Sequence, residues 1–148
     1  MSTAKAETTG EREEMTPEEL ARRIAALIDE KQGEDIVALD VGELVGYTDV
    51  MLICTARNER LAKAIHDEIH ERLKHDDGLL PVRSEGVGEN SWILLDYLDC
   101  IVHIFVPETR DRYRLDQLWG EADELDLELP VAGEGGGGDT AEAVRRPA

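Results

Sequence analysis

The stretch Ser91-Trp-Ile-Leu-Leu-Asp-Tyr-Leu-Asp-Cys-Ile-Val-His-Ile-Phe-Val106 decides the fold of this chain. It holds two runs of strand-forming residues, 91–97 and 99–106, rich in Ile, Val and aromatic side chains. A single residue, Leu98, separates the two runs. Strands joined so tightly must form an antiparallel hairpin, so a β-sheet is expected at the centre of the domain.

Alternating helix and strand patterns surround this hairpin. Thr16 and Glu19 form a capping box, and Pro17 occupies the first position of the helix behind it. The segments predicted around the hairpin are a helix at 17–32, strands at 36–41 and 50–55, a helix at 61–73, a strand at 80–84 and a helical or turn segment at 110–119. We therefore predict an α/β (α+β) fold with a mixed five-stranded sheet flanked by helices. The strands at 50–55 and 80–84, which a helix connects, are expected to be parallel.

Composition divides the chain into three parts. Residues 1–15 are polar and charged, and we predict a disordered N-terminal segment. Residues 130–148 include Gly135 to Gly138 and few apolar side chains, which is typical of a flexible, Gly-rich acidic tail. Residues 16–129 are expected to form one domain, which is large enough to fold without a disulfide or a metal.

The formal net charge of −18 limits the classes of partner. It argues against direct nucleic-acid binding and against anionic membranes, because both need an excess of Lys and Arg. It fits a basic protein partner, or simply a solvated acidic surface. We expect a cytoplasmic protein, because no segment reaches 18 apolar residues and the N-terminus lacks the apolar run of a signal peptide. Cys54 and Cys100 lie in apolar runs and are predicted to be buried free thiols.

His66 and His70 have the i, i+4 spacing of a zinc motif on one helix face. A metalloprotease would carry Glu directly after the first His, where this chain has Asp67. The available third ligands are His75, Glu85 and His103. We interpret the pair as exposed polar residues on the outer face of an amphipathic helix and predict no metal or cofactor. A metal-dependent enzyme remains the alternative hypothesis.

Two further patterns could indicate catalysis. Asp96 and Asp99 flank the hairpin turn, where carboxylates could hold a divalent ion. Nucleotidyltransferases place such carboxylates two residues apart on one strand, after a Gly-Ser turn, and neither feature is present. Cys100 and His103 point to opposite faces of their strand and so do not form a nucleophile–base pair. We predict no catalytic residue.

A group of aromatic residues is the remaining feature. Trp92, Tyr97, Phe105, Tyr113 and Trp119 all fall within one window of the chain. Aromatic side chains and Arg, with carboxylates around them, are typical of protein–protein interfaces. We expect Trp92 to be exposed, and we assign Trp119 equally to the surface and to the core. The predicted partner-binding residues are Glu85, Trp92, Asp96, Asp99, His103, Arg110 and Tyr113.

A series of short motifs runs from about Leu20 to Trp119. The motifs are 34–41 (EDIVALDV), 48–55 (TDVMLICT), Arg60, Ala64-Ile65, 78–81 (GLLP), Glu85-Gly86, 92–96 (WILLD), 99–103 (DCIVH), and Arg110 with Tyr113, Leu115 and Leu118-Trp119. In this order and spacing they resemble the ribosomal silencing factor family, RsfS, also called Iojap. The chain departs from the family pattern at 56–59, at Leu61 and at Leu98, which stands where the family hairpin usually has Gly.

The resemblance implies a nucleotidyltransferase-like fold without its catalytic residues. It also implies binding to the large ribosomal subunit through ribosomal protein L-fourteen. A protein bound there would block association with the small subunit and repress translation under nutrient limitation or in stationary phase. Ribosomal proteins are commonly basic, so the acidic charge of this chain complements such a partner. A homodimer away from the ribosome is a further implication.

Overall fold

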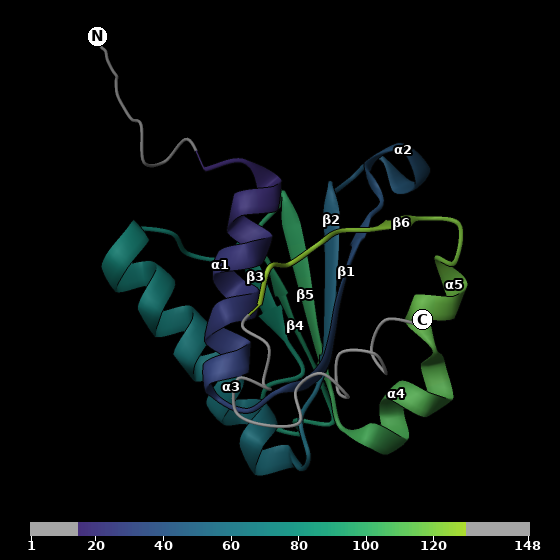
Figure 1. Ribbon diagram of the computed structural model, residues 1–148. Coiled ribbons are helices and arrows are strands. Elements are labelled where there is room, and N and C mark those ends of the chain that lie inside the picture. Colours follow the sequence, from purple (N-terminus) through teal and green to yellow (C-terminus); the bar gives the residue numbers. More distant parts are fainter. Residues whose placement is uncertain (1–14, 130–148) are drawn as a thin grey trace, which may run out of the picture.

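A six-stranded mixed sheet forms the centre of the computed structural model, which describes residues 15–129 (Figure 1). The strands are β1 (Glu34–Asp40), β2 (Val50–Thr55), β3 (Arg83–Glu85), β4 (Trp92–Asp96), β5 (Cys100–Phe105) and β6 (Asp123–Glu124), in the spatial order β3-β4-β5-β2-β1-β6. β2 and β5 are parallel neighbours, and the other neighbouring pairs are antiparallel. Of the predicted terminal segments 1–15 and 130–148, only Met15 is among the described residues, and it packs against the apolar core.

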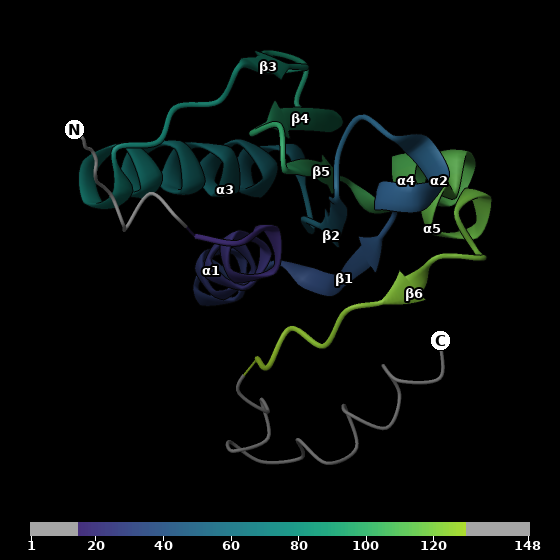
Figure 2. The same cartoon turned by 90° about the horizontal axis from the view of Figure 1, so that it is seen from above.

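Helices cover both faces of this sheet. They are α1 (Pro17–Glu30), α2 (Gly42–Val45), α3 (Glu59–Arg72), the π-helical turn η2 (Leu73–Asp77), α4 (Pro107–Tyr113) and α5 (Leu115–Leu118). Figure 2 shows α1 and α3 on one face and the shorter α2, α4 and α5 on the other. The predicted capping box is confirmed, because the Thr16 hydroxyl accepts from the Glu19 N–H and the Glu19 carboxylate accepts from the Thr16 N–H.

Strand alternation divides the interior into two apolar clusters. The larger one lies under α1 and α3 and includes Ile24, Ile28, Leu52, Ile65, Ile69, Val102 and Ile104. The smaller one lies on the opposite face and consists of Leu39, Val41, Met51, Ile53 and Phe105, with Trp92, Leu115 and Trp119 packed against it. β2 and β5 contribute to both clusters and are buried along their whole length. This double burial explains why their sequences are almost continuously apolar.

Several element predictions are corrected. β2 and β3 do run in the same direction, but β5 and β4 separate them in the sheet. β3 begins at Arg83, because pairing with β4 rather than the apolar content of 80–82 sets its position. The last helical segment starts at Pro107, which suits the first helical position, and is interrupted at Arg114 with φ 47°. α2 and the two-residue β6 are too short to give a sequence pattern.

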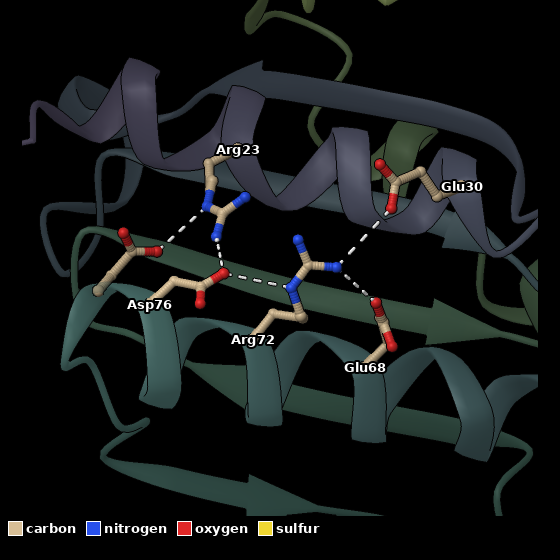
Figure 3. A network of polar contacts seen from close by, with 6 residues as sticks. Arg23, Glu30, Glu68, Arg72 and Asp76 are labelled. Carbon is tan, nitrogen blue, oxygen red and sulfur yellow. Dashed lines mark hydrogen bonds and ion pairs between the residues drawn. The ribbon is translucent and has the colours of Figure 1, made fainter.

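Ion pairs on the solvent side join α1 to α3 and η2 (Figure 3). Arg72 lies 3.0 Å from Glu68 and 3.2 Å from Asp76, and it reaches Glu30 of α1 at 4.0 Å. Arg23 of α1 pairs with the same Asp76 at 3.0 Å. The hydrogen bond from Arg72 holds the pKa of the Asp76 carboxyl below its usual value. Solvent screens each of these pairs, so the large apolar cluster beneath them is the main source of stability.

The two cysteines are buried free thiols, as predicted. Cys54 and Cys100 lie in the larger cluster, on β2 and β5. Burial raises the pKa of the Cys54 thiol to about 12 and raises that of Cys100 as well. Both side chains therefore act as small apolar residues. Within residues 15–129, no helix has the length and apolar content to cross a membrane.

Candidate functional site

Four aromatic rings meet on the face of the sheet opposite α1 and α3. Trp92 is the first residue of β4 and lies opposite Phe105 of β5, with ring centroids 4.9 Å apart. Its ring is 4.8 Å from Tyr113, at the end of α4, and 5.9 Å from His103. Tyr113 is 49% exposed, whereas Phe105 is fully buried. We call Trp92, His103, Phe105 and Tyr113 the aromatic cluster; it extends from the core to the surface.

A hydrogen bond fixes the protonation pattern inside this cluster. The Trp92 Nε1–H donates to His103 Nδ1 at 3.0 Å. An indole N–H can only donate, so Nδ1 accepts and neutral His103 carries its proton on Nε2. Burial lowers the pKa of His103 to about 4. His103 is therefore neutral near pH 7 and supports Trp92 from beneath the surface.

The prediction that Trp92 is exposed is wrong. Its side chain is half-buried and packs against the smaller cluster. Strand register places the ring over Phe105, and His103 satisfies the indole N–H that would otherwise need water. Trp119 is also half-buried and packs against the same cluster, so it belongs at least partly to the core.

Carboxylates border the aromatic cluster along β3 and β4. Arg83 lies 3.3 Å from Glu85 and 3.4 Å from Asp96, so one guanidinium connects the two predicted acidic residues. Alternation along β4 places Asp96 on the same face as Trp92. We call Arg83, Glu85, Trp92, Asp96 and Tyr113 the docking face. In Figure 2, β3 and β4 extend beyond α2, α4 and α5, and Arg83 and Glu85 on β3 are exposed within the described chain.

Asp96 also shapes the hairpin turn. Its Oδ1 accepts from the Leu98 N–H at 2.8 Å, and Leu98 has a left-handed φ of 73°. For a residue that has a Cβ, this backbone conformation costs roughly 1–2 kcal/mol of stability. The hydrogen bond from Leu98 to Asp96 therefore explains how this chain forms the turn without glycine.

Two of the predicted partner-binding residues lie elsewhere. Arg110 donates to the backbone oxygen of Asp35 at 2.7 Å and to the Thr55 hydroxyl at 2.8 Å. It thereby attaches α4 to β1 and β2. Asp99 lies in the hairpin turn, where its backbone oxygen accepts from the N–H groups of Asp49 and Val50. The structure thus groups Trp92, His103 and Tyr113 in the aromatic cluster and joins Glu85 to Asp96 through Arg83 on the same side of the sheet, whereas Arg110 and Asp99 make other contacts.

Sequence reasoning missed two contributors to the docking face. Arg83 gave no signal, because only the pairing of β3 with β4 places it between two carboxylates. Gly86 has a left-handed φ of 86°, and a Cβ there would collide with the backbone oxygen of Trp92. Glycine at this position lets the loop pass directly over the start of β4. The signal available in the sequence was that Glu85-Gly86 precedes Trp92 by only a few residues.

The other histidine group lies on the α3 side of the sheet. His66 is only 8% exposed, so the prediction of an exposed His66 is wrong. Its ring centroid is 5.8 Å from that of His70. Of the proposed third ligands, Glu85 and His103 belong to the opposite face, and His75 is exposed on η2. Among residues 15–129, no three His, Cys, Asp or Glu side chains come together as a metal site.

The fold and these motifs agree with known proteins. The RsfS family model, described as ribosomal silencing factor during starvation, matches residues 14–146. The chain belongs to the RsfS family. A protein of Bacillus subtilis (strain 168) named ribosomal silencing factor RsfS is 34% identical over 115 residues, which is 78% of this chain and 97% of the relative. This membership confirms the family resemblance.

Two solved structures show the same RsfS-type fold. A crystal structure of a Chromobacterium violaceum protein has a TM-score of 0.69 and 28% identity, and the match covers 80% of this chain and 98% of that one. A second, from Bacillus halodurans, has a TM-score of 0.64 and 30% identity, with 73% and 97% coverage. The predicted mixed α/β fold is therefore confirmed, with six strands in place of five.

Proposed function

We propose that this protein is a ribosomal silencing factor that works by binding rather than by catalysis. Membership of the RsfS family and relatives named ribosomal silencing factor support this function. The observation that carries it is the docking face, where the half-exposed Tyr113 packs on Trp92, and Glu85 and Asp96 pair with Arg83 on the same side of the sheet. Aromatic side chains bordered by charged groups are the usual composition of a protein-binding site.

The partner that fits this surface is a basic protein on the large ribosomal subunit. The chain carries a net charge of −18, which favours rapid encounter with a cationic surface. Arg83 is 53% exposed at its side chain and shared between Glu85 and Asp96. A cationic group of the partner can therefore replace one of its contacts at little cost. By family resemblance we assign this partner as ribosomal protein L-fourteen.

The proposed consequence is steric. A protein bound to L-fourteen on the subunit interface prevents the small subunit from joining and lowers translation, most of all under nutrient limitation or in stationary phase. We assign this action to the cytoplasm. We also infer from the resemblance that the protein forms a homodimer when it is away from the ribosome; sedimentation velocity across a concentration series tests the dimer.

Co-sedimentation with purified large subunits tests the function. We expect the folded wild type to pellet with large subunits, less strongly as salt rises, and to reduce formation of whole ribosomes when small subunits are added. Direct binding to isolated L-fourteen tests the named partner. Failure of the folded protein to pellet at both low and moderate salt contradicts the proposed function.

Matched variants test the docking face. Tyr113→Ala removes an exposed aromatic ring of the face, and Glu85→Lys reverses one of its charges. Each should weaken large-subunit binding by about tenfold or more, as residues in an energetic centre of an interface do. Tyr47→Ala is the control, since Tyr47 is 62% exposed and lies outside the docking face. If Tyr113→Ala and Tyr47→Ala bind equally well, the site is wrongly placed.

A further inference from the structure

A line of polar side chains runs from α3 to β3 on the face of the sheet away from the docking face. Lys63 Nζ lies 2.8 Å from Asp67 Oδ2, and Asp67 Oδ1 lies 2.9 Å from His66 Nδ1. On the other side of the ring, His66 Nε2 lies 3.3 Å from Ser84 Oγ. The order is therefore carboxylate, imidazole and serine hydroxyl, with a lysine behind the carboxylate.

The hydrogens in this line have one consistent arrangement. Burial opposes ionisation of Asp67, but hydrogen bonds from Lys63 and His66 outweigh it and hold the pKa of that carboxyl below its usual value. Ionised Asp67 can only accept, so His66 Nδ1–H donates to it. In neutral His66 this leaves the Nε2 lone pair facing Ser84 Oγ. The imidazole is thus oriented to take the serine proton.

Accessibility distinguishes this line from a merely satisfied buried histidine. His66 is 8% exposed, but Ser84 lies on the exposed edge strand β3 and its residue is open to solvent. A buried base with a fixed tautomer next to an accessible hydroxyl is the arrangement that activates a serine for nucleophilic attack. None of the three side chains belongs to the docking face.

We propose that Ser84 is an activated nucleophile that accepts an acyl group from an activated ester. His66 is the general base, and Asp67 is a positioning residue that holds the tautomer of His66. Ser84 Oγ attacks the ester carbonyl carbon while its proton moves to His66 Nε2. The bond from carbonyl carbon to the leaving oxygen then breaks, and Nε2–H returns the proton to that leaving group. The products are an O-acyl-Ser84 ester and the free alcohol or phenol.

Acetylation of the full-length protein by p-nitrophenyl acetate tests this site. Peptide mapping by mass spectrometry follows each acetylated residue over time. Ser91 is the internal control, because it is the other serine that the structure describes. General-base assistance is typically worth about 100-fold or more, so acetyl-Ser84 should form at least that much faster than acetyl-Ser91. Equal rates at the two serines would overturn the proposal.

Variants separate activation from simple exposure. His66→Gln should reduce acetylation of Ser84 to the Ser91 rate, and Asp67→Asn should slow it by about tenfold or more, because the amide also stabilises the wrong tautomer. His70→Gln is the matched control, since His70 lies beside the His66 ring on the same helix, while it is His66 that faces the Ser84 hydroxyl. If folded Asp67→Asn protein acetylates Ser84 at the wild-type rate, Asp67 has no positioning role. If both His66→Gln and His70→Gln leave the rate unchanged, Ser84 is not activated. Ribosome binding is expected to be unchanged in Ser84→Ala, so the two proposals fail independently.

Discussion

His66 and His103 are buried to nearly the same extent, 8% and 6% exposed, on opposite faces of one sheet. The Nδ1 atom of His103 accepts from Trp92, whereas the Nδ1 atom of His66 faces the carboxylate of Asp67. The two rings therefore have opposite tautomers. His103 directs its acceptor into the aromatic cluster, and His66 directs its acceptor at an exposed hydroxyl. Equal burial thus gives one histidine a structural role and the other a chemical one.

The surrounding layers explain this difference. On the His103 face, short helices and aromatic rings form a small cluster that reaches the surface at Tyr113. On the His66 face, the long helices α1 and α3 enclose a much larger cluster, and polar side chains are confined to its border. The two proposals thus place binding and nucleophilic reactivity on opposite faces of one small domain. Four measurements test the comparison of the two faces, in order of expected effect.

The largest effect is expected for Phe105→Ala. Phe105 is fully buried at the base of the aromatic cluster, so the change leaves a cavity under Trp92 and should lower the free energy of unfolding by about 3–5 kcal/mol. Urea unfolding measures the change, and Tyr113→Ala is the exposed aromatic control. A decrease of less than about 1 kcal/mol in the free energy of unfolding would show that the smaller apolar cluster on the His103 face does not act as a second core.

Acidification is expected to have the second-largest effect on stability, through His103. Burial lowers the pKa of His103 from its ordinary value of 6.5 to about 4 in the folded protein, so the unfolded chain binds more protons between those values. The contribution of His103 to the free energy of unfolding is fully present above about pH 6.5. It is lost as the pH drops toward 4, and the loss is roughly 3 kcal/mol at most. Chemical unfolding across this range measures the slope. His103→Gln should reduce the slope, and an unchanged slope in that variant contradicts the assignment.

Leu98→Gly should have a smaller effect of opposite sign. The hairpin that carries both Trp92 and His103 turns at Leu98 with a φ of 73°. Glycine adopts this conformation without strain, so the variant should gain about 1 kcal/mol of stability. A thermal melt at neutral pH measures the gain. A destabilised variant would show that the exposed Leu98 side chain makes a contact that outweighs the strain.

Arg72→Gln is expected to have the smallest effect. It removes the guanidinium that connects α3 to Glu30 and Asp76 on the border of the His66 face (Figure 3). Because these side chains are solvated, stability should fall slightly at low salt and not at all near 1 M salt, where charges are screened within a few ångströms. Urea unfolding at both salt concentrations measures it. A large loss that persists at high salt would mean that this pairing, and not the apolar cluster, holds α1 to α3.

The sequence predicted the regular elements and the family, because those depend on local patterns. The capping box at Thr16, the continuously apolar β2 and the hairpin of β4 and β5 each follow from neighbouring residues. The short pieces α2 and β6 were missed, since four and two residues carry no periodicity. β6 exists because it pairs with β1, and the ends of the α2 segment are joined by the hydrogen bond from the Val41 N–H to the Asp49 oxygen.

The sites were predicted less completely, for the same physical reason. Composition identified the aromatic and acidic residues, and five of the seven named ones lie on one side of the sheet, three of them in ring contact and two of them paired with Arg83. Arg110 instead reaches Asp35, seventy-five positions away, and His66 meets Ser84, eighteen positions away. No local pattern encodes such pairs.

The sequence by itself thus determined an acidic RsfS-type α/β domain with buried thiols, a glycine-less hairpin and an aromatic window. Only the tertiary structure decided that Trp92 is half-buried on His103, that Arg83 links Glu85 to Asp96, and that His66 lies between Asp67 and Ser84. Local propensity and periodicity set which segments become helices and strands. The pairing of β3 with β4 and the packing of α3 against the sheet set which side chains then meet, and those long-range contacts give each histidine its role.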